Sequence, residues 1–173
     1  YSQKINFNKP YQKKKINENA IIYYKNLYKK IFIKETNEYI AINKPSGLAV
    51  QGGSKQKFHI DDMLKCISNV NVSPKLVHRI DKDTSGLLLL AKDSKTAKKF
   101  TSFFKDQKII KTYLAIVSPC PNDDIGIIDL PLLKSGTKDY QRMSVDQNMG
   151  KRAITEYKVV DKIGSRVALV ALY

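Results

Sequence analysis

The run of four leucines at positions 87–90 places the strongest constraint on how this chain folds. An uninterrupted apolar run of this length is typical of a β-strand that is buried on both faces. Gly86 stands at its start, where a residue without a Cβ permits a tight backbone bend. The sequence therefore predicts a rigid strand whose entrance holds polar side chains at the rim of the core.

The polar turn before this strand gathers several chemically active side chains. It consists of His78, Arg79, Ile80, Asp81, Lys82, Asp83, Thr84, Ser85 and Gly86. A carboxylate at the edge of a buried strand has the defined position that catalysis requires, and Asp81 is the candidate. On position alone, Asp81 could instead cap the turn that follows it. Arg79 could likewise be a structural ion-pair partner of Asp81 or Asp83.

This turn resembles the signature of the RluA/RluC/RluD-type pseudouridine synthases, usually His-Arg-Leu-Asp-x-x-Thr-Ser-Gly. The only departure is Ile80 in place of leucine. Three further stretches are similar to segments of the same family and follow in the expected order: residues 42–50, 111–117 and 150–155. The resemblance covers residues 30–173, and the stretch 43–53 favours the RluC-like branch.

The resemblance implies an isomerase that converts uridine in RNA to pseudouridine without a metal or a cofactor. Asp81 is then the catalytic carboxylate at ribose C1′, by a nucleophilic or a glycal route. Arg79 enters the position that the flipped uridine vacates, and Tyr113 stacks against the flipped uracil. The other residues of the signature are expected to support the turn that carries Asp81: His78, Thr84, Ser85 and Gly86. Tyr113 could also be an ordinary strand aromatic, and His59 is expected to be structural.

The charge balance favours an acidic partner. The chain has 31 Lys and Arg against 16 Asp and Glu, a formal net charge of +15. Nucleic acid is the usual partner of such a chain. Codon composition is an alternative source of part of this charge, because the chain is rich in Lys, Ile and Asn together. With the resemblance, we expect large-subunit ribosomal RNA as substrate, and transfer RNA remains open.

The cysteines and the hydropathy of the chain indicate in which cellular compartment the protein works. Cys66 and Cys120 lie far apart without Cys-x-x-Cys spacing, which argues against a zinc site and a disulfide framework. Reduced cytosolic thiols are the simpler interpretation. The sequence has neither an apolar stretch of membrane-span length nor a signal-peptide pattern. We therefore expect a cytoplasmic protein with no membrane partner, and by the resemblance a monomer.

The hydrophobic periodicity predicts an α+β fold with a largely antiparallel mixed sheet and flanking helices. Helices are expected at residues 60–67 and after Ser94 as N-cap, with Ala97, Phe100, Thr101 and Phe104 facing inward. Strands are expected at 30–34, 39–43, 111–117, 125–133, 141–145, 153–160 and 166–172. By the resemblance this is the pseudouridine synthase catalytic fold.

The domain organisation follows from composition and from the resemblance. Residues 1–29 are expected to be a basic tail or linker, with a strip of RNA-phosphate contacts as the alternative. Residues 30–173 are expected to be the catalytic domain. We expect it to be truncated at its C-terminus, because the chain stops in an apolar run before the family's basic Thr-Gly-Arg-x-His-Gln-x-Arg segment.

Two other functions remain open on the sequence. An RNA-binding module without catalysis would result if that basic segment is truly missing. A magnesium-dependent phosphatase of the haloacid dehalogenase type is the other. Its Asp-x-Asp-x-Thr loop is matched only loosely, because Thr84 falls one residue early after Asp81 and Asp83. The apolar strand also follows this loop instead of preceding it.

Overall fold

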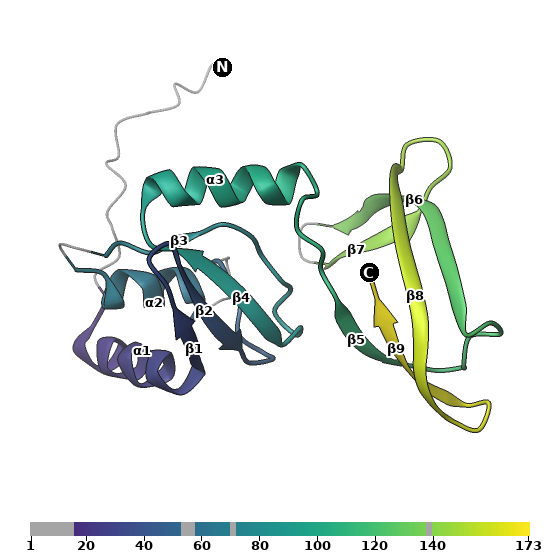
Figure 1. Ribbon diagram of the computed structural model, residues 1–173, viewed down its shortest axis with the longest axis horizontal. Helices are drawn as coiled ribbons and strands as arrows, with labels where there is room; N and C mark the ends of the chain where they lie inside the picture. Colours follow the sequence, from purple (N-terminus) through teal and green to yellow (C-terminus); the bar gives the residue numbers. More distant parts are fainter. Residues whose placement is uncertain (1–15, 53–57, 70–71, 138–139) are drawn as a thin grey trace, which may run out of the picture. The chain divides into compact units, whose positions relative to one another are not determined.

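The computed structural model describes residues 16–52, 58–69, 72–137 and 140–173, which divide into two compact units (Figure 1). The first unit is Tyr1–Lys108 and the second is Ile109–Tyr173. Each unit is built on its own antiparallel sheet. Within the described ranges, no helix is both long enough and apolar enough to span a bilayer.

The first unit combines a four-stranded sheet with helices. Its elements are α1 (Glu18–Ile31), β1 (Phe32–Glu35), β2 (Tyr39–Lys44), α2 (Ile60–Ile67), β3 (Lys75–Leu76), β4 (Gly86–Ala91) and α3 (Ser94–Lys105). The strand order is β1-β2-β4-β3, and every pairing is antiparallel. The leucine strand β4 is therefore central, with β2 on one side and β3 on the other.

Helices cover both faces of this sheet (Figure 1). Ile42 of β2 and Leu88 of β4 are partners in register, and both belong to the buried core that α1 and α2 complete. Tyr39 points to the opposite face, where its ring meets Phe100 of α3 at 6.0 Å between centroids. The sheet thus lies between α3 on one side and α1 with α2 on the other.

The leucine strand is buried fully on one face only, which corrects the expectation of two buried faces. Leu88 and Leu90 are completely buried, whereas Leu87 is 58% exposed. Side chains of a strand alternate between faces, so Leu87, Leu89 and Ala91 share the second face. Exposure falls along that face towards Ala91, because α3 covers only the end where Tyr39 pairs with Ala91.

Two of the three helices were expected, and one of these begins at a different cap. Helix α2 has the predicted bounds. The N-cap of α3 is Asp93, and not Ser94 as expected, because the Asp93 carboxylate accepts a hydrogen bond from the Thr96 amide at 2.7 Å. Thr96 is also buried under the sheet's second face, while Thr101, expected to face inward, is exposed.

The expected tail or linker at residues 1–29 is corrected for its second half. Residues from Glu18 form helix α1, which the side chain of Asn17 caps by accepting from the Ala20 amide at 2.8 Å. Tyr24 of this helix is only 1% exposed, and Ile31 is also in the core. An apolar stripe at helical spacing, 24-27-28-31, therefore packs α1 into the first unit. Residues 1–15 lie outside the described ranges.

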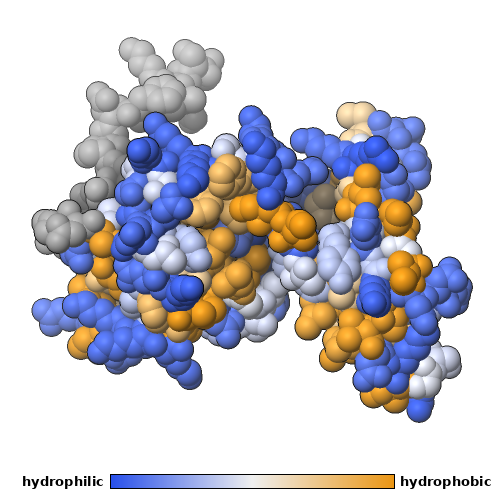
Figure 2. All heavy atoms as spheres, viewed as in Figure 1, coloured by the Kyte–Doolittle hydropathy of each residue, from blue (hydrophilic) through white to orange (hydrophobic). Residues whose placement is uncertain are grey.

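The second unit is a five-stranded antiparallel sheet in the order β5-β9-β8-β6-β7. Its strands are β5 (Tyr113–Val117), β6 (Ile125–Thr137), β7 (Tyr140–Val145), β8 (Lys151–Ile163) and β9 (Val167–Leu172). Each was expected, with somewhat different ends. The fully buried apolar side chains among its described residues all belong to β9, and Figure 2 shows apolar surface on this unit. The predicted α+β class with largely antiparallel strands is confirmed.

Candidate active site

The signature turn lies at one end of the first unit's sheet. It connects β3 to β4, and Gly86, the first residue of β4, pairs with Lys44, the last residue of β2. The turn before β4 and the loop after β2 therefore meet at the same edge. Gly86 has φ of 122°, a backbone conformation that a side chain disfavours, so the glycine allows the chain to bend into the strand.

Asp81 presents an exposed carboxylate from this turn. The turn itself is closed by the main chain, because the Thr84 amide donates to the Asp81 carbonyl oxygen at 3.2 Å. Within the described ranges, no side chain or amide donates a hydrogen bond to the Asp81 carboxylate. The alternative that this carboxylate caps the turn is thus not what the structure shows. The carboxylate is accessible to a substrate.

Lys44 lies beneath the turn as a completely buried cation. Its Nζ donates to the carbonyl oxygens of Pro45 at 3.0 Å, Leu48 at 2.7 Å and Lys82 at 3.0 Å. These bonds use all three donors of the ammonium group. They tie the loop after β2 to the turn that carries Asp81, across 38 positions of sequence.

Electrostatics also connect Lys44 to the turn. Burial lowers the pKa of Lys44 below its ordinary value, while the carboxylates of Asp83 and Asp81 act in the opposite direction. The buried ammonium and these two carboxylates therefore attract one another. Lys44 was not among the expected site residues, although it lies in the stretch 42–50 that carries part of the family resemblance. The only available signal was a lysine at the end of an apolar strand.

Two further hydrogen bonds hold the loop against the turn. Ser46 Oγ donates to the Asp83 carbonyl oxygen at 2.8 Å, and the Gly47 amide donates to the Lys82 carbonyl oxygen at 2.9 Å. Gly47 has φ of 81°, which again suits glycine. Ile80, the one departure from the family signature, packs against the core of the first unit. The turn is thus fixed on both sides of Asp81.

Arg79 is exposed two positions before Asp81. Its Nη1 donates to Gln51 Oε1 at 3.3 Å. The ion pairs formed among the described residues do not include Arg79, so the alternative of a structural pair with Asp81 or Asp83 is not found there. Its entry into the space of a flipped base stays a prediction.

His78 is held between the sheet and α3. Its Nε2 accepts a hydrogen bond from the Leu89 amide at 2.9 Å, and its ring stacks on Phe104 with centroids 4.3 Å apart. A ring nitrogen that accepts a hydrogen bond from an amide uses its lone pair for it, so Nε2 is committed to the main chain of β4. This anchors the start of the turn to β4.

Tyr113 lies in the second unit. It opens β5 opposite Leu172 of β9, and its side chain is 39% exposed. The stacking role of Tyr113 stays a prediction. The side chains of Thr84 and Ser85 make no hydrogen bond within the described ranges, and their supporting role also stays a prediction.

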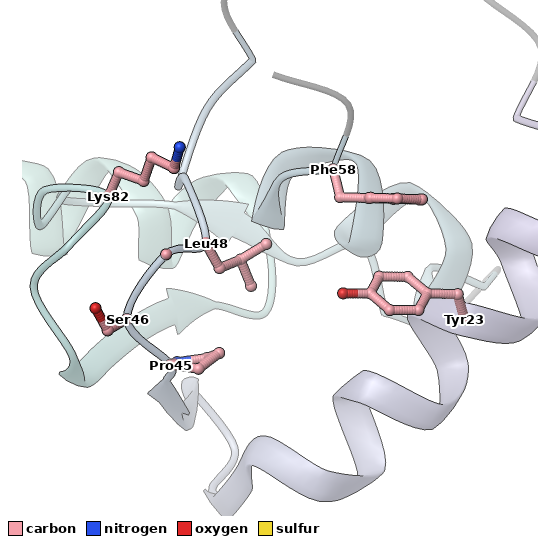
Figure 3. Close-up of a pocket in the computed structure, with 7 residues that line it drawn as sticks. Tyr23, Pro45, Ser46, Leu48, Phe58 and Lys82 are labelled. Atoms are coloured by element: carbon pink, nitrogen blue, oxygen red, sulfur yellow. The ribbon is translucent and has the colours of Figure 1, made fainter. Parts of the chain in front are cut away.

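A cavity of about 420 Å³ lies beside the signature turn (Figure 3). Its walls come from α1, from the loop after β2, from Phe58, which precedes the N-cap of α2, and from the turn itself. The side chains drawn there are Tyr23, Pro45, Ser46, Leu48, Phe58 and Lys82.

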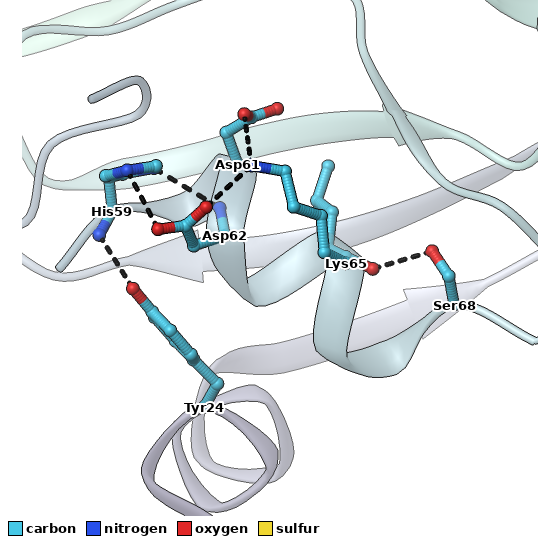
Figure 4. Close-up of polar contacts among 7 residues, drawn as sticks. Tyr24, His59, Asp61, Asp62, Lys65 and Ser68 are labelled. Atoms are coloured by element: carbon cyan, nitrogen blue, oxygen red, sulfur yellow. Dashed lines mark hydrogen bonds and ion pairs between the residues drawn. The ribbon is translucent and has the colours of Figure 1, made fainter. Parts of the chain in front are cut away.

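A histidine and two carboxylates cluster at the start of α2 (Figure 4). His59 is the N-cap of this helix, and its Nδ1 accepts from the Asp62 amide at 3.2 Å. Lys65 Nζ lies 2.6 Å from a carboxylate oxygen of Asp62 and 3.4 Å from one of Asp61. His59 caps the helix, and Lys65 forms ion pairs with both carboxylates, so contacts within α2 already account for this cluster.

Comparison with known proteins identifies the family. Residues 38–173 match the family of RNA pseudouridylate synthases, a match that runs through both units. The chain belongs to this family, and the membership predicted from the signature turn is confirmed.

Individual relatives agree with this assignment. The ribosomal large subunit pseudouridine synthase C of Rickettsia typhi is 41% identical over 138 residues, which cover 80% of this chain and 46% of the relative. The protein of the same name from Vibrio vulnificus is 34% identical over 132 residues, 76% of this chain and 41% of the relative. The chain therefore spans less than half the length of these relatives.

Solved structures support the fold. The human RNA pseudouridylate synthase domain containing 4 superposes with a TM-score of 0.72 at 24% identity, covering 89% of this chain and 62% of that structure. The human RNA pseudouridylate synthase domain containing 1 has a TM-score of 0.65 at 18% identity, covering 82% and 58%. At these identities the likeness concerns the fold alone.

Proposed function

We propose that this chain carries the catalytic turn of an RNA pseudouridine synthase that acts on large-subunit ribosomal RNA. The observation that supports the proposal most directly is the exposed Asp81 carboxylate, held on a turn that Lys44 and Ser46 fix from below. The ribosomal substrate is inferred from the names of the bacterial relatives. The net charge of +15 suits a polyanionic substrate.

The reaction is an isomerisation that needs no redox partner. The bond from uracil N1 to ribose C1′ breaks, the base turns, and a bond from C5 to C1′ forms. C5 loses its hydrogen as a proton and N1 gains a proton, so atoms and electrons balance. Asp81 acts at the ribose, either by attack on C1′ or by removal of a sugar proton.

The substrate must reach this carboxylate as an extruded nucleotide, because a stacked uridine hides its glycosidic bond. Unstacking costs a few kcal/mol. Arg79, exposed two positions before Asp81, offsets part of this cost by entering the vacated space, and Tyr113 stacks on the flipped base. These roles follow from the family resemblance of the two residues.

The test is tritium release from ribosomal RNA labelled at uracil C5. We expect release by the parent protein and a loss of at least about a hundredfold in Asp81→Asn, because the amide is neither a nucleophile nor a base. Asp83→Asn is the matched control in the same turn, and it should lose less than about tenfold, because Asp83 is held through its carbonyl oxygen.

The outcomes separate the remaining functions. Equal rates in the parent and Asp81→Asn would remove Asp81 from the chemistry. Absence of release by the parent, with RNA binding intact, would favour the RNA-binding module. Release from transfer RNA but not from ribosomal RNA would change the substrate and leave the reaction in place.

A further inference from the structure

The cavity beside the signature turn has the composition of a binding site for a planar base. Its walls include two aromatic rings, Tyr23 and Phe58, whose centroids lie 4.6 Å apart at an interplanar angle of 41°. Leu48 and Pro45 lie across the space from them, and the Tyr23 hydroxyl points toward that loop (Figure 3). A volume of about 420 Å³ is within the range of ordinary ligand pockets.

The polar groups around the cavity suit a nucleotide. Lys82 contributes an ammonium group, and among the described residues it forms no ion pair. Ser46 adds a hydroxyl whose oxygen can still accept a hydrogen bond while it donates to Asp83. Tyr23 is 43% exposed, so its ring is accessible. A base would find stacking surface, and a phosphate would find a free cation.

The cavity is connected rigidly to the catalytic carboxylate. Lys82 directly follows Asp81, so their Cα atoms are about 3.8 Å apart. The Lys82 carbonyl oxygen accepts from both Lys44 Nζ and the Gly47 amide, at 3.0 and 2.9 Å. The wall formed by residues 45–48 therefore cannot move independently of the turn that presents Asp81.

We propose that this cavity binds an unpaired nucleotide of the RNA that neighbours the target uridine in the strand. Its base packs against Tyr23 and Phe58, and its phosphate faces Lys82. This inference rests on the proposed function, because the nucleotide belongs to the same RNA. The extruded uridine leaves its neighbour without a stacking partner, and the two aromatic rings replace that partner.

The first test compares Tyr23→Leu with Tyr23→Phe in the tritium-release assay. Tyr23→Leu removes the ring and should raise KM for ribosomal RNA about tenfold with kcat changed less than about twofold, whereas Tyr23→Phe keeps the ring and should stay within about threefold of the parent. Tyr28→Leu is the matched control, since Tyr28 lies on the same helix and packs against Phe32 away from the cavity. Thermal unfolding of each variant reports whether it is folded.

The second test removes the cation. Lys82→Gln should weaken binding of a single-stranded RNA oligomer and reduce the slope of log affinity against log salt by about one, the signature of one lost phosphate contact. Lys75→Gln, an exposed lysine of β3, is the matched control and should leave the slope unchanged. The change should be the same for RNAs of different sequence.

The results distinguish this inference from the proposed function. If the parent releases tritium and Tyr23→Leu has the same KM as Tyr28→Leu, the cavity does not bind the RNA and the isomerase stands. If the parent releases none, the isomerase fails, and the affinity of Tyr23→Leu for the RNA oligomer still tests the cavity. Uridine monophosphate binding as tightly as the oligomer would overturn the assignment to RNA.

Discussion

Lys44 connects the two loops of the candidate site through hydrogen bonds of its buried ammonium group. It is buried, no carboxylate of the described residues forms a hydrogen bond with it, and three carbonyl oxygens from two separate loops accept its donors. A buried charge is tolerated when its hydrogen bonds are complete. The turn that carries Asp81 thus depends on a residue that does not contact the substrate itself in the proposed reaction.

Replacement of Lys44 should therefore lower the stability of the folded state. Lys44→Met keeps the length of the side chain but leaves the carbonyl oxygens of Leu48 and Lys82 without this donor. We expect the free energy of unfolding to fall by about 2–4 kcal/mol, measured by urea denaturation. Lys98→Met, on the exposed side of α3, is the control and should change it by less than about 0.5 kcal/mol. Equal stability of the two variants would contradict the role given to Lys44.

Residue types alone could indicate Asp81, Arg79 and Gly86, but not Lys44. The first three lie in one contiguous signature, and the glycine has the positive φ that its place before a strand suggested. The partners of Lys44 are set by the pairing of β2 with β4, which brings Lys82 close to it. The hydrogen bond from Lys44 to Lys82 joins residues 38 positions apart, and no local sequence pattern predicts such a contact.

At the scale of elements, helix α3 depends on a cap that titrates. The Asp93 carboxylate accepts from the Thr96 amide, and this hydrogen bond, with smaller contributions from the Thr96 hydroxyl and Lys95, holds the pKa of Asp93 below its ordinary value. The depressed pKa means that the ionised form stabilises the folded state. That stability is complete above the unfolded pKa and is lost as pH falls through the folded pKa.

Because the Asp93 cap titrates, the difference in melting temperature between the parent and Asp93→Asn should depend on pH. Asp93→Asn keeps a side-chain oxygen for the Thr96 amide at every pH, so its cap does not titrate. The parent should lose melting temperature relative to Asp93→Asn when pH is lowered from about 6 to about 3. Circular dichroism at the two pH values measures this. A constant difference would show that the carboxylate does not cap the helix.

Helix α1 and helix α2 differ in how well the sequence predicted them. Helix α2 follows an apolar stripe with acidic residues in its first turn, and its bounds are as predicted. Helix α1 has a weaker pattern, because lysines and polar residues surround its stripe and hide it in a basic segment. Its packing gives it stability: the Tyr24 hydroxyl accepts from the His59 amide at 3.2 Å, which joins α1 to the start of α2.

At the scale of the whole molecule, charge governs the interaction with RNA. Lysine and arginine exceed aspartate and glutamate by 31 to 16. Phosphate neutralisation releases counterions, so affinity falls steeply with salt. We expect RNA affinity to fall at least about tenfold between about 50 and about 200 mM salt, measured by fluorescence anisotropy. Affinity that is constant over this range would indicate that the charge is a compositional bias and not an RNA-binding feature.

The sequence by itself determined the family, the α+β class, most strands and the residues of the signature turn, because these are carried by contiguous patterns. Only the tertiary structure decided how far β4 is buried, which carbonyl oxygens bind the ammonium group of Lys44, and which side chains surround the cavity. Each of these depends on segments that are distant along the chain. The cavity is lined by residues from four segments, because β2 and β4 pair and α1 packs on their common face. These residues are Tyr23, Leu48, Phe58 and Lys82.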